Sequence, residues 1–173
     1  MKKEVNTVMN NRLSCEEFCS LYGEIKDSLY RYALYRLGNP ADAEDAVSDA
    51  VLAAWRGIEG LKDVSAFSAW LFAILRNTCN SGIKRIISER EKIEKAGRDT
   101  SAMSENSDCE PGLLSKELSE ALDILSDDER EIVILSVVAG LSSKEISDMT
   151  GLTAGSVRSK LSRSLTKMRE FLS

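Results

Sequence analysis

The sequence predicts an all-α protein made of two small helical domains, and three observations support this prediction. Apolar residues recur with the helical period almost throughout the chain. The 173 residues include only two prolines and ten glycines, fewer turn-forming residues than a β-sandwich or barrel would need. A small, polar and acidic segment, residues 96–112, interrupts the helical pattern and is expected to be a flexible linker. The predicted domains are therefore residues 1–95 and 113–173.

Three helices are expected in the N-terminal domain. The first spans about residues 16–37. Asn39-Pro40 is typical of an N-cap followed by a proline at the first helical position, and starts a second helix that extends to about residue 58. A third helix is expected over residues 66–92, with Ser65 as its N-cap.

The C-terminal domain is expected to contain four helices, the first near residues 114–125. Residues 126–129 and 142–145 each have the S-x-x-E pattern of a capping box, which begins a helix. Gly151 then turns the chain, and Thr153 caps a long final helix. A short helix, a turn with glycine and a longer helix together form the helix-turn-helix pattern.

Composition argues against several classes of function. The chain has no histidine, which excludes zinc sites of the Cys/His type and removes the commonest general base. We therefore expect no metal, no cofactor, no catalytic residue and no enzyme activity. No apolar run approaches the roughly 18–20 residues of a membrane span, and no apolar stretch follows the N-terminal lysines as in a secretory signal. These observations predict a cytoplasmic protein that does not insert into a membrane.

The final helix is basic, although the whole chain has 23 basic and 28 acidic residues and a net charge of −5. At about 100° per residue, one side of this helix is apolar. The apolar stripe is formed by Val157, Leu161, Leu165, Met168 and Leu172. The opposite side combines serines, which permit close approach to DNA, with cations that reach guanine edges and phosphates. A solvated amphipathic helix is the alternative, but charge of a single sign disfavours it.

Two surfaces of the N-terminal domain are candidates for binding. Asp42, Asp45 and Asp49 share one face of the second helix, which is either solvated surface or a docking face for a basic partner. On the third helix, Trp70 shares a face with polar and basic residues. An aromatic ring beside amides and cations suits single-stranded DNA, although a core position for Trp70 is the alternative.

A family resemblance rests on three segments, LYRYALYRLGNPADAEDAVSDAVLAAWRGI, AFSAWLFAILRNTCNSGIKR and LSDDEREIVILSVVAGLSSKEISDMTGLTAGSVRSKLSRSLTKMREFL. The first two closely resemble region 2 of the extracytoplasmic-function (ECF) sigma factors of bacterial RNA polymerase, and the third resembles their region 4. The resemblance covers about residues 16–92 and 114–172, in the order that the family has.

The resemblance implies a separate role for each surface. The second helix would dock on the polymerase clamp through the face of Asp45 and Asp49. The third helix and the loop before it would recognise and melt the promoter minus-10 element through Phe67, Trp70, Arg76, Asn77, Lys84 and Arg85. The final helix would recognise the minus-35 element through Ser156, Arg158, Ser159, Lys160 and Arg163.

The expected partners are therefore bacterial core RNA polymerase, promoter DNA and an anti-sigma factor, which in this family is often anchored in the membrane. Two other functions stay open at this point. A stand-alone helix-turn-helix regulator would bind duplex DNA tightly without polymerase, which the weak total charge disfavours. A helical anti-sigma or adaptor protein would not touch DNA, so alanine at Lys160 and Arg163 would leave it unaffected.

Overall fold

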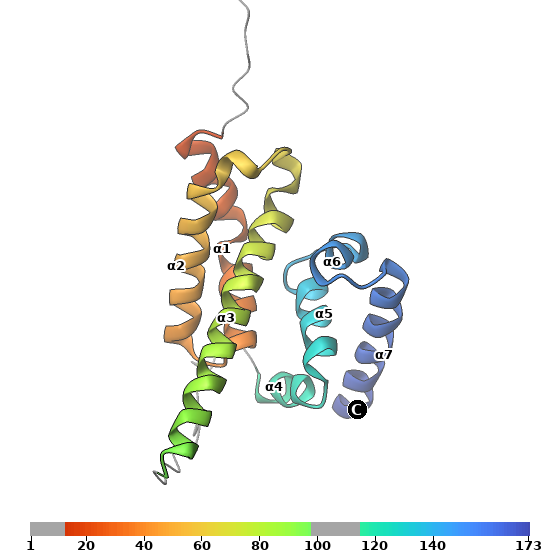
Figure 1. The fold of residues 1–173 in the computed structure, drawn as a ribbon. Coiled ribbons are helices and arrows are strands. Elements are labelled where there is room, and N and C mark those ends of the chain that lie inside the picture. Colours follow the sequence, from red (N-terminus) through yellow and green to blue (C-terminus); the bar gives the residue numbers. More distant parts are fainter. Residues whose placement is uncertain (1–12, 98–114) are drawn as a thin grey trace, which may run out of the picture.

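The computed structural model describes residues 13–97 and 115–173, and within these two ranges it contains helices and turns but no strand. Figure 1 shows the helices of the first range as an upright bundle, with the helices of the second range packed beside it. We call residues 13–97 the N-terminal unit and residues 115–173 the C-terminal unit. The all-α prediction is confirmed, while residues 98–112 of the expected linker lie outside the described residues.

The first two helices, α1 (Cys15–Leu37) and α2 (Pro40–Arg56), are antiparallel neighbours joined by a two-residue turn. Gly38 has a φ of 70°, a left-handed conformation that glycine adopts without steric strain. The Asn39 side chain then accepts the backbone N–H groups of Ala41 and Asp42 at 2.8 and 3.3 Å, as the prediction of an N-cap requires.

The connection to the third helix, α3 (Phe67–Lys95), differs from the prediction. Two 3-10 turns, η1 (Ile58–Gly60) and η2 (Val64–Ala66), precede it. Asp63 accepts the backbone N–H of Ser65 at 2.9 Å and caps the second of these turns. The prediction that Ser65 caps the third helix is therefore wrong, because the local hydrogen bond of Asp63 fixes a turn before α3 begins.

The N-terminal unit has an aromatic core between α1 and α3, which α2 covers with small side chains. Phe18 meets Phe67 edge-to-face with a centroid distance of 5.4 Å, and Tyr32 meets Phe72 in the same way at 5.9 Å. The fully buried alanines of α2 allow its backbone to approach this core closely, and they are Ala43, Ala50 and Ala54.

The C-terminal unit consists of α4 (Lys116–Asp123), α5 (Asp127–Val137), α6 (Ser143–Thr150) and α7 (Ala154–Leu172). The structure confirms both predicted capping boxes, which begin α5 and α6. Gly151, with a φ of 75°, turns the chain between α6 and α7. These two helices form the predicted helix-turn-helix, in which α7 packs on both α5 and α6.

The packing side of α7 differs from the predicted apolar stripe. Leu165 is 38% exposed and Leu172 is 52% exposed, while the small polar residue Ser164 is completely buried. Ser164 donates a hydrogen bond to the carbonyl of Lys160 at 2.8 Å, so its hydroxyl is satisfied within the helix. A small side chain at this position lets α7 lie close to its neighbours, which turns the buried face toward Ser164 and away from Leu165.

Glu129 connects the beginning of α5 to α7. Its carboxylate accepts a hydrogen bond from Lys167 Nζ at 2.8 Å and another from the backbone N–H of Ser126 at 3.1 Å. The Lys167 bond, followed by the Ser126 bond, lowers the pKa of Glu129 from its ordinary value of 4.5 to about 2.

This lowered pKa predicts an acid-sensitive contribution to stability. The contribution of the Glu129 carboxylate is fully present above about pH 4.5 and is lost as the pH falls toward 2, because the unfolded chain binds the proton more readily. We expect Glu129→Gln to show a smaller fall in Tm between about pH 5 and about pH 3 than the wild type, measured by circular dichroism. Glu120→Gln, on the surface of α4, is the control and should follow the wild type.

Candidate nucleic-acid interface

The exposed face of α7 holds three of the side chains predicted to contact the minus-35 element. Arg158, Ser159 and Arg163 line an open, shallow surface together with Ser162. Arg163 Nε donates to the carbonyl of Ser159 at 3.3 Å, which directs the guanidinium along this surface. The sequence prediction missed Ser162, although its position four residues after Arg158 places the two on the same side of the helix.

The other two predicted minus-35 residues have partners inside the C-terminal unit. The Ser156 hydroxyl lies 2.9 Å from the hydroxyl of Thr153, the residue that caps α7. Lys160 Nζ lies 3.6 Å from a carboxylate oxygen of Asp128 on α5. Both side chains therefore lie at the edge of the α7 surface rather than at its centre.

Two aromatic residues at the start of α3 have different environments. Phe67 is only 2% exposed and packs on Phe18, so its ring belongs to the core of the N-terminal unit. Trp70 is partly exposed and lies against Phe67 with a centroid distance of 6.2 Å. Trp70 can therefore present a ring to a ligand while Phe67 supports that ring from below.

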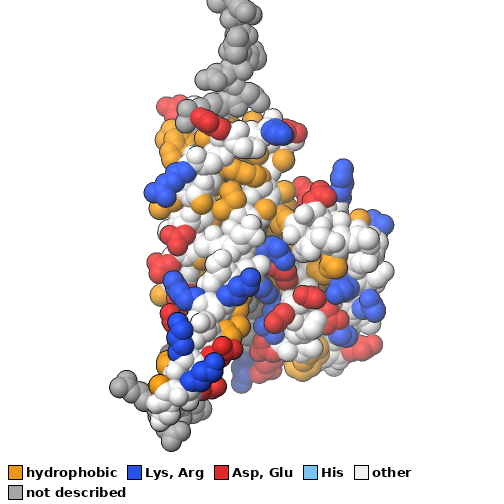
Figure 2. Space-filling view, in the orientation of Figure 1, with side chains coloured by type: hydrophobic (Ala, Val, Ile, Leu, Met, Phe, Trp, Pro, Cys, Tyr) orange, Lys and Arg blue, Asp and Glu red, His pale blue; other side chains and the backbone are white. Residues whose placement is uncertain are grey.

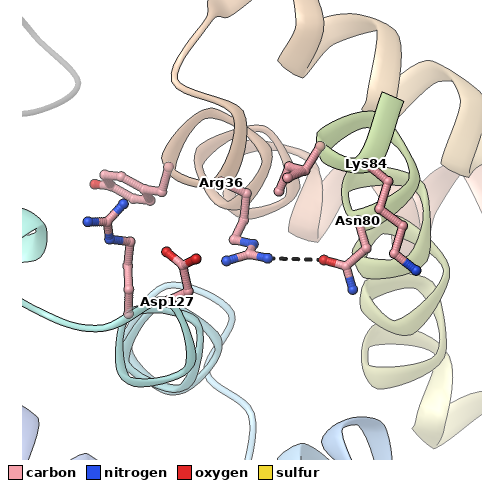
Figure 3. A pocket seen from close by; sticks show the side chains of 7 residues that line it. Arg36, Asn80, Lys84 and Asp127 are labelled. Atoms are coloured by element: carbon pink, nitrogen blue, oxygen red, sulfur yellow. Dashed lines mark hydrogen bonds between the residues drawn. The ribbon is translucent and has the colours of Figure 1, made fainter. Parts of the chain in front are cut away.

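The basic and amide residues of α3 face in three directions. Figure 2 shows blue side chains along the lower half of α3, with red ones among them. Asn77 is exposed. Lys84 lines a pocket of about 330 Å³ between the two units, where Arg36 donates to Asn80 at 3.0 Å and Asp127 of α5 lies opposite (Figure 3). Arg85 lies on the other flank of α3, toward α2.

Asp45 and Asp49 form one wall of a groove between α2 and α3. The groove has a volume of about 500 Å³, and Arg85 contributes to the α3 wall. Both aspartates are exposed. This arrangement gives a depression with acidic side chains along one edge, a charge pattern that suits a basic segment of a partner protein.

Arg76, predicted to contact the minus-10 element, lies at the junction of the two units. Its Nε and Nη2 donate to the two carboxylate oxygens of Glu131 at 2.8 and 3.1 Å, and its Nη1 donates to the carbonyl of Met149 at 3.2 Å. The hydrogen bond to Glu131 raises the pKa of Arg76. The guanidinium therefore bonds to two helices of the C-terminal unit, α5 and α6.

Two residues of α1 complete the environment of Glu131. Tyr32 donates its hydroxyl to the carboxylate at 3.2 Å, and burial raises the pKa of Tyr32 well above its ordinary range, so the hydroxyl keeps its proton. Arg36 Nη2 lies 3.9 Å from the same carboxylate. We call Tyr32, Arg36, Arg76 and Glu131 the Glu131 cluster. The sequence prediction missed this cluster except for Arg76.

Neither a metal site nor a membrane span is found in the part of the chain that the structure describes. Within residues 13–97 and 115–173, the cysteine and acidic side chains form no group of three that could hold a metal ion. No helix in these ranges is long and apolar enough to cross a bilayer.

The different environments of Phe67 and Trp70 predict different losses of stability. Phe67→Ala would leave a cavity in the core and is expected to destabilise the protein by about 3–5 kcal/mol. Trp70→Ala should cost clearly less, because part of the ring already faces water. Urea unfolding followed by circular dichroism measures both values, and equal losses would make Trp70 a core residue instead of a surface ring.

Comparison with known proteins agrees with this geometry. The family model for Sigma-70 region 2 matches residues 21–86, and the model for Sigma-70, region 4 matches residues 115–168. The ECF RNA polymerase sigma factor EcfG of Rhodopseudomonas palustris is 30% identical over 149 residues, which cover 84% of this chain and 79% of that protein. The ECF RNA polymerase sigma factor SigL of Mycobacterium tuberculosis is 31% identical over 158 residues, covering 87% and 85% of the two chains.

A solved structure shows the same fold. The sigma factor RpoE from Bartonella quintana, in a co-crystal structure with the anti-sigma factor NepR, superposes with a TM-score of 0.72 and 27% sequence identity. The superposition covers 91% of this chain and 97% of the other. Together with the family matches to both regions, these relatives show that the chain belongs to the ECF RNA polymerase sigma factors.

Proposed function

We propose that this sigma factor docks on core RNA polymerase through α2 and directs it to promoters whose two elements are recognised by α3 and α7. Residues 1–95 supply polymerase binding and minus-10 recognition, residues 113–173 supply minus-35 recognition, and residues 96–112 connect them. Sigma factors are transcription-initiation factors and have no catalytic activity of their own, so the polymerase performs the chemistry.

The open face of α7 is the observation that best supports this proposal. Arg158, Ser159, Ser162 and Arg163 form one continuous surface on the second helix of a helix-turn-helix. Arginines reach guanine edges and phosphates, and the serines between them leave room for the DNA backbone. Ser156 and Lys160, at the edge of this surface, contact the flanking phosphates when α7 lies in the major groove.

The minus-10 surface follows from the side chains of α3. Trp70 offers a ring on which an unpaired base stacks, and Asn77, Lys84 and Arg85 lie further along the same helix. Arg76 is the one predicted minus-10 residue whose guanidinium bonds to Glu131 and Met149 in this structure, so it supports the proposal least. The ring of Phe67 is buried and cannot contact DNA, so Phe67 contributes by holding the ring of Trp70 in place.

Asp45 and Asp49 form the docking face for polymerase. Their groove along α2 is acidic on one edge and has an apolar floor that includes Leu37 and Ala46. Such a surface fits a basic and apolar helical element of the polymerase. The protein acts where the polymerase and the chromosome are, so we place it in the cytoplasm.

An anti-sigma factor is the proposed regulator of this activity. RpoE, which shares the fold over almost its whole length, was crystallised with the anti-sigma factor NepR. A partner of this kind would cover the docking and DNA-binding surfaces of the present chain.

Run-off transcription tests the proposal as a whole. Bacterial core RNA polymerase is incubated with sheared genomic DNA, with and without the protein, and the transcripts are sequenced. We expect discrete new start sites that share paired upstream motifs near minus-10 and minus-35. Transcripts no different from those of core polymerase alone, with the protein folded, would refute the proposal.

The minus-35 role of α7 predicts a loss of transcription on substitution. Arg163→Ala should lower initiation from the identified promoters by about 5–150-fold, which corresponds to the 1–3 kcal/mol of a good arginine–base contact. Lys116→Ala removes the same charge from an 89% exposed side chain of α4 and should leave initiation unchanged. An equal effect of both variants would mean that only net charge matters.

The docking role of α2 predicts that substitutions on this helix weaken the binding of core polymerase, whether or not promoter DNA is present. Asp45→Ala combined with Asp49→Ala should weaken the binding of core polymerase, measured by fluorescence anisotropy of the labelled protein. Glu44→Ala, on the opposite flank of the exposed side of α2, is the matched control. Unchanged polymerase affinity of the double variant would remove the docking assignment.

A further inference from the structure

The five cations of α7 differ in whether a carboxylate faces them. Lys160 Nζ lies 3.6 Å from an oxygen of Asp128. Lys167 Nζ lies 2.8 Å from an oxygen of Glu129, and both carboxylates lie in the first turn of α5. Among residues 13–97 and 115–173, no ion pair involves the exposed arginines of α7, which are Arg158, Arg163 and Arg169. The first turn of α5 therefore neutralises the two lysines of this helix and leaves its three arginines facing solvent.

The two ion pairs differ in exposure. The Glu129 side chain is 18% exposed and also accepts the backbone N–H of Ser126 at 3.1 Å, so it helps to begin α5. The Asp128 side chain is 75% exposed and accepts no hydrogen bond from the described residues. Water screens an ion pair as exposed as that of Asp128, which then contributes little to stability. The main physical effect of Asp128 is therefore on the charge that Lys160 presents at the outside of α7.

Lys160 lies where a lysine can contact DNA phosphates. It is at the edge of the α7 surface, and 30% of its side chain is exposed. An ammonium group on a flexible stem acts as a point charge, which binds phosphate without reading the base sequence. The carboxylate of Asp128 opposes this contact in two ways. It occupies the ammonium group, and its own negative charge repels an approaching phosphate.

We propose that Asp128 limits the sequence-independent part of DNA binding by keeping Lys160 from the phosphates that flank the α7 surface. This inference rests on the proposed minus-35 role of α7. Arg158 and Arg163, which reach base edges under that proposal, lie on the open surface and are not paired with α5. Asp128 is therefore a positioning residue, which lowers the affinity for every duplex by the same factor and leaves the preference between sequences unchanged.

The test compares Asp128→Asn with the wild type in the full-length chain. Fluorescence anisotropy measures the binding of a labelled duplex of random sequence, about 20 base pairs long, between about 50 mM and about 200 mM salt. We expect the variant to bind more tightly, on the order of tenfold at the lowest salt. Each added phosphate contact steepens the dependence of log K on log salt by about 0.9, so this advantage should shrink about 3.5-fold at the highest salt.

Two controls show whether the gain comes from Lys160. Asp127→Asn makes the same charge change at the neighbouring position of α5, which has no ion pair with α7 within the described residues, and it should change the affinity much less. Lys160→Met should have little effect alone, because the ammonium group is already paired, and it should remove the gain when combined with Asp128→Asn. The combination is needed because Asp128 also lines a small cavity beside Arg76.

The possible results separate this inference from the proposed function. Equal salt slopes in Asp128→Asn and the wild type overturn the inference, and so does a gain that Asp127→Asn reproduces or that persists in the Lys160→Met background. A duplex that carries the minus-35 motif from the run-off experiment should gain by the same factor as random DNA, and a gain confined to the motif would also overturn the inference. Start sites together with unchanged slopes would leave the sigma-factor role in place and remove only the role of Asp128.

Discussion

The burial of one carboxylate, Glu131, is the constraint on which the arrangement of the two units depends. The buried apolar residues of the two units form one cluster, with aromatic rings between α1 and α3 and apolar side chains of α5 and α7. Glu131 is a charged residue buried beside this cluster. Two hydrogen bonds from Arg76 and one from Tyr32 compensate the cost of burying its charge. The placement of the two units in this structure therefore depends on an ion pair between α3 and α5.

The docking groove of α2, the ring of Trp70 and the arginine and serine surface of α7 all lie outside the buried core. Asp45 and Asp49 line a groove, while the buried alanines on another side of α2 pack against the other helices of the N-terminal unit. Trp70 is partly exposed and packs on the buried ring of Phe67. The arginines and serines of α7 lie on the side of that helix opposite its buried residues. This separation explains how an acidic chain presents basic surfaces locally, because screening confines the field of each surface to roughly 10 Å.

The sequence predicted features that depend on a few neighbouring residues and missed features that depend on packing. Both capping boxes, the N-cap Asn39 and the turn at Gly151 are local, and all were predicted correctly. The buried face of α7 depends on Ser164, a small polar residue that a search for apolar residues passes over. Glu131 left a detectable signal, since it lies three and four residues before buried Ile134 and Leu135 and so shares their face. Its partners, 55 and 99 residues away along the chain, could not be identified from spacing.

The way α7 is held has a consequence for how such proteins diverge. Thr153 and Gly151 fix where the helix begins, and Val157, Ser164 and Met168 fix how it packs. None of these five belongs to the exposed set of Arg158, Ser159, Ser162 and Arg163. Under the proposed minus-35 role, substitutions on the exposed set would change which DNA sequence is preferred without changing how the helix folds. Duplicated copies of such a gene can acquire different promoters by mutations that leave stability almost untouched.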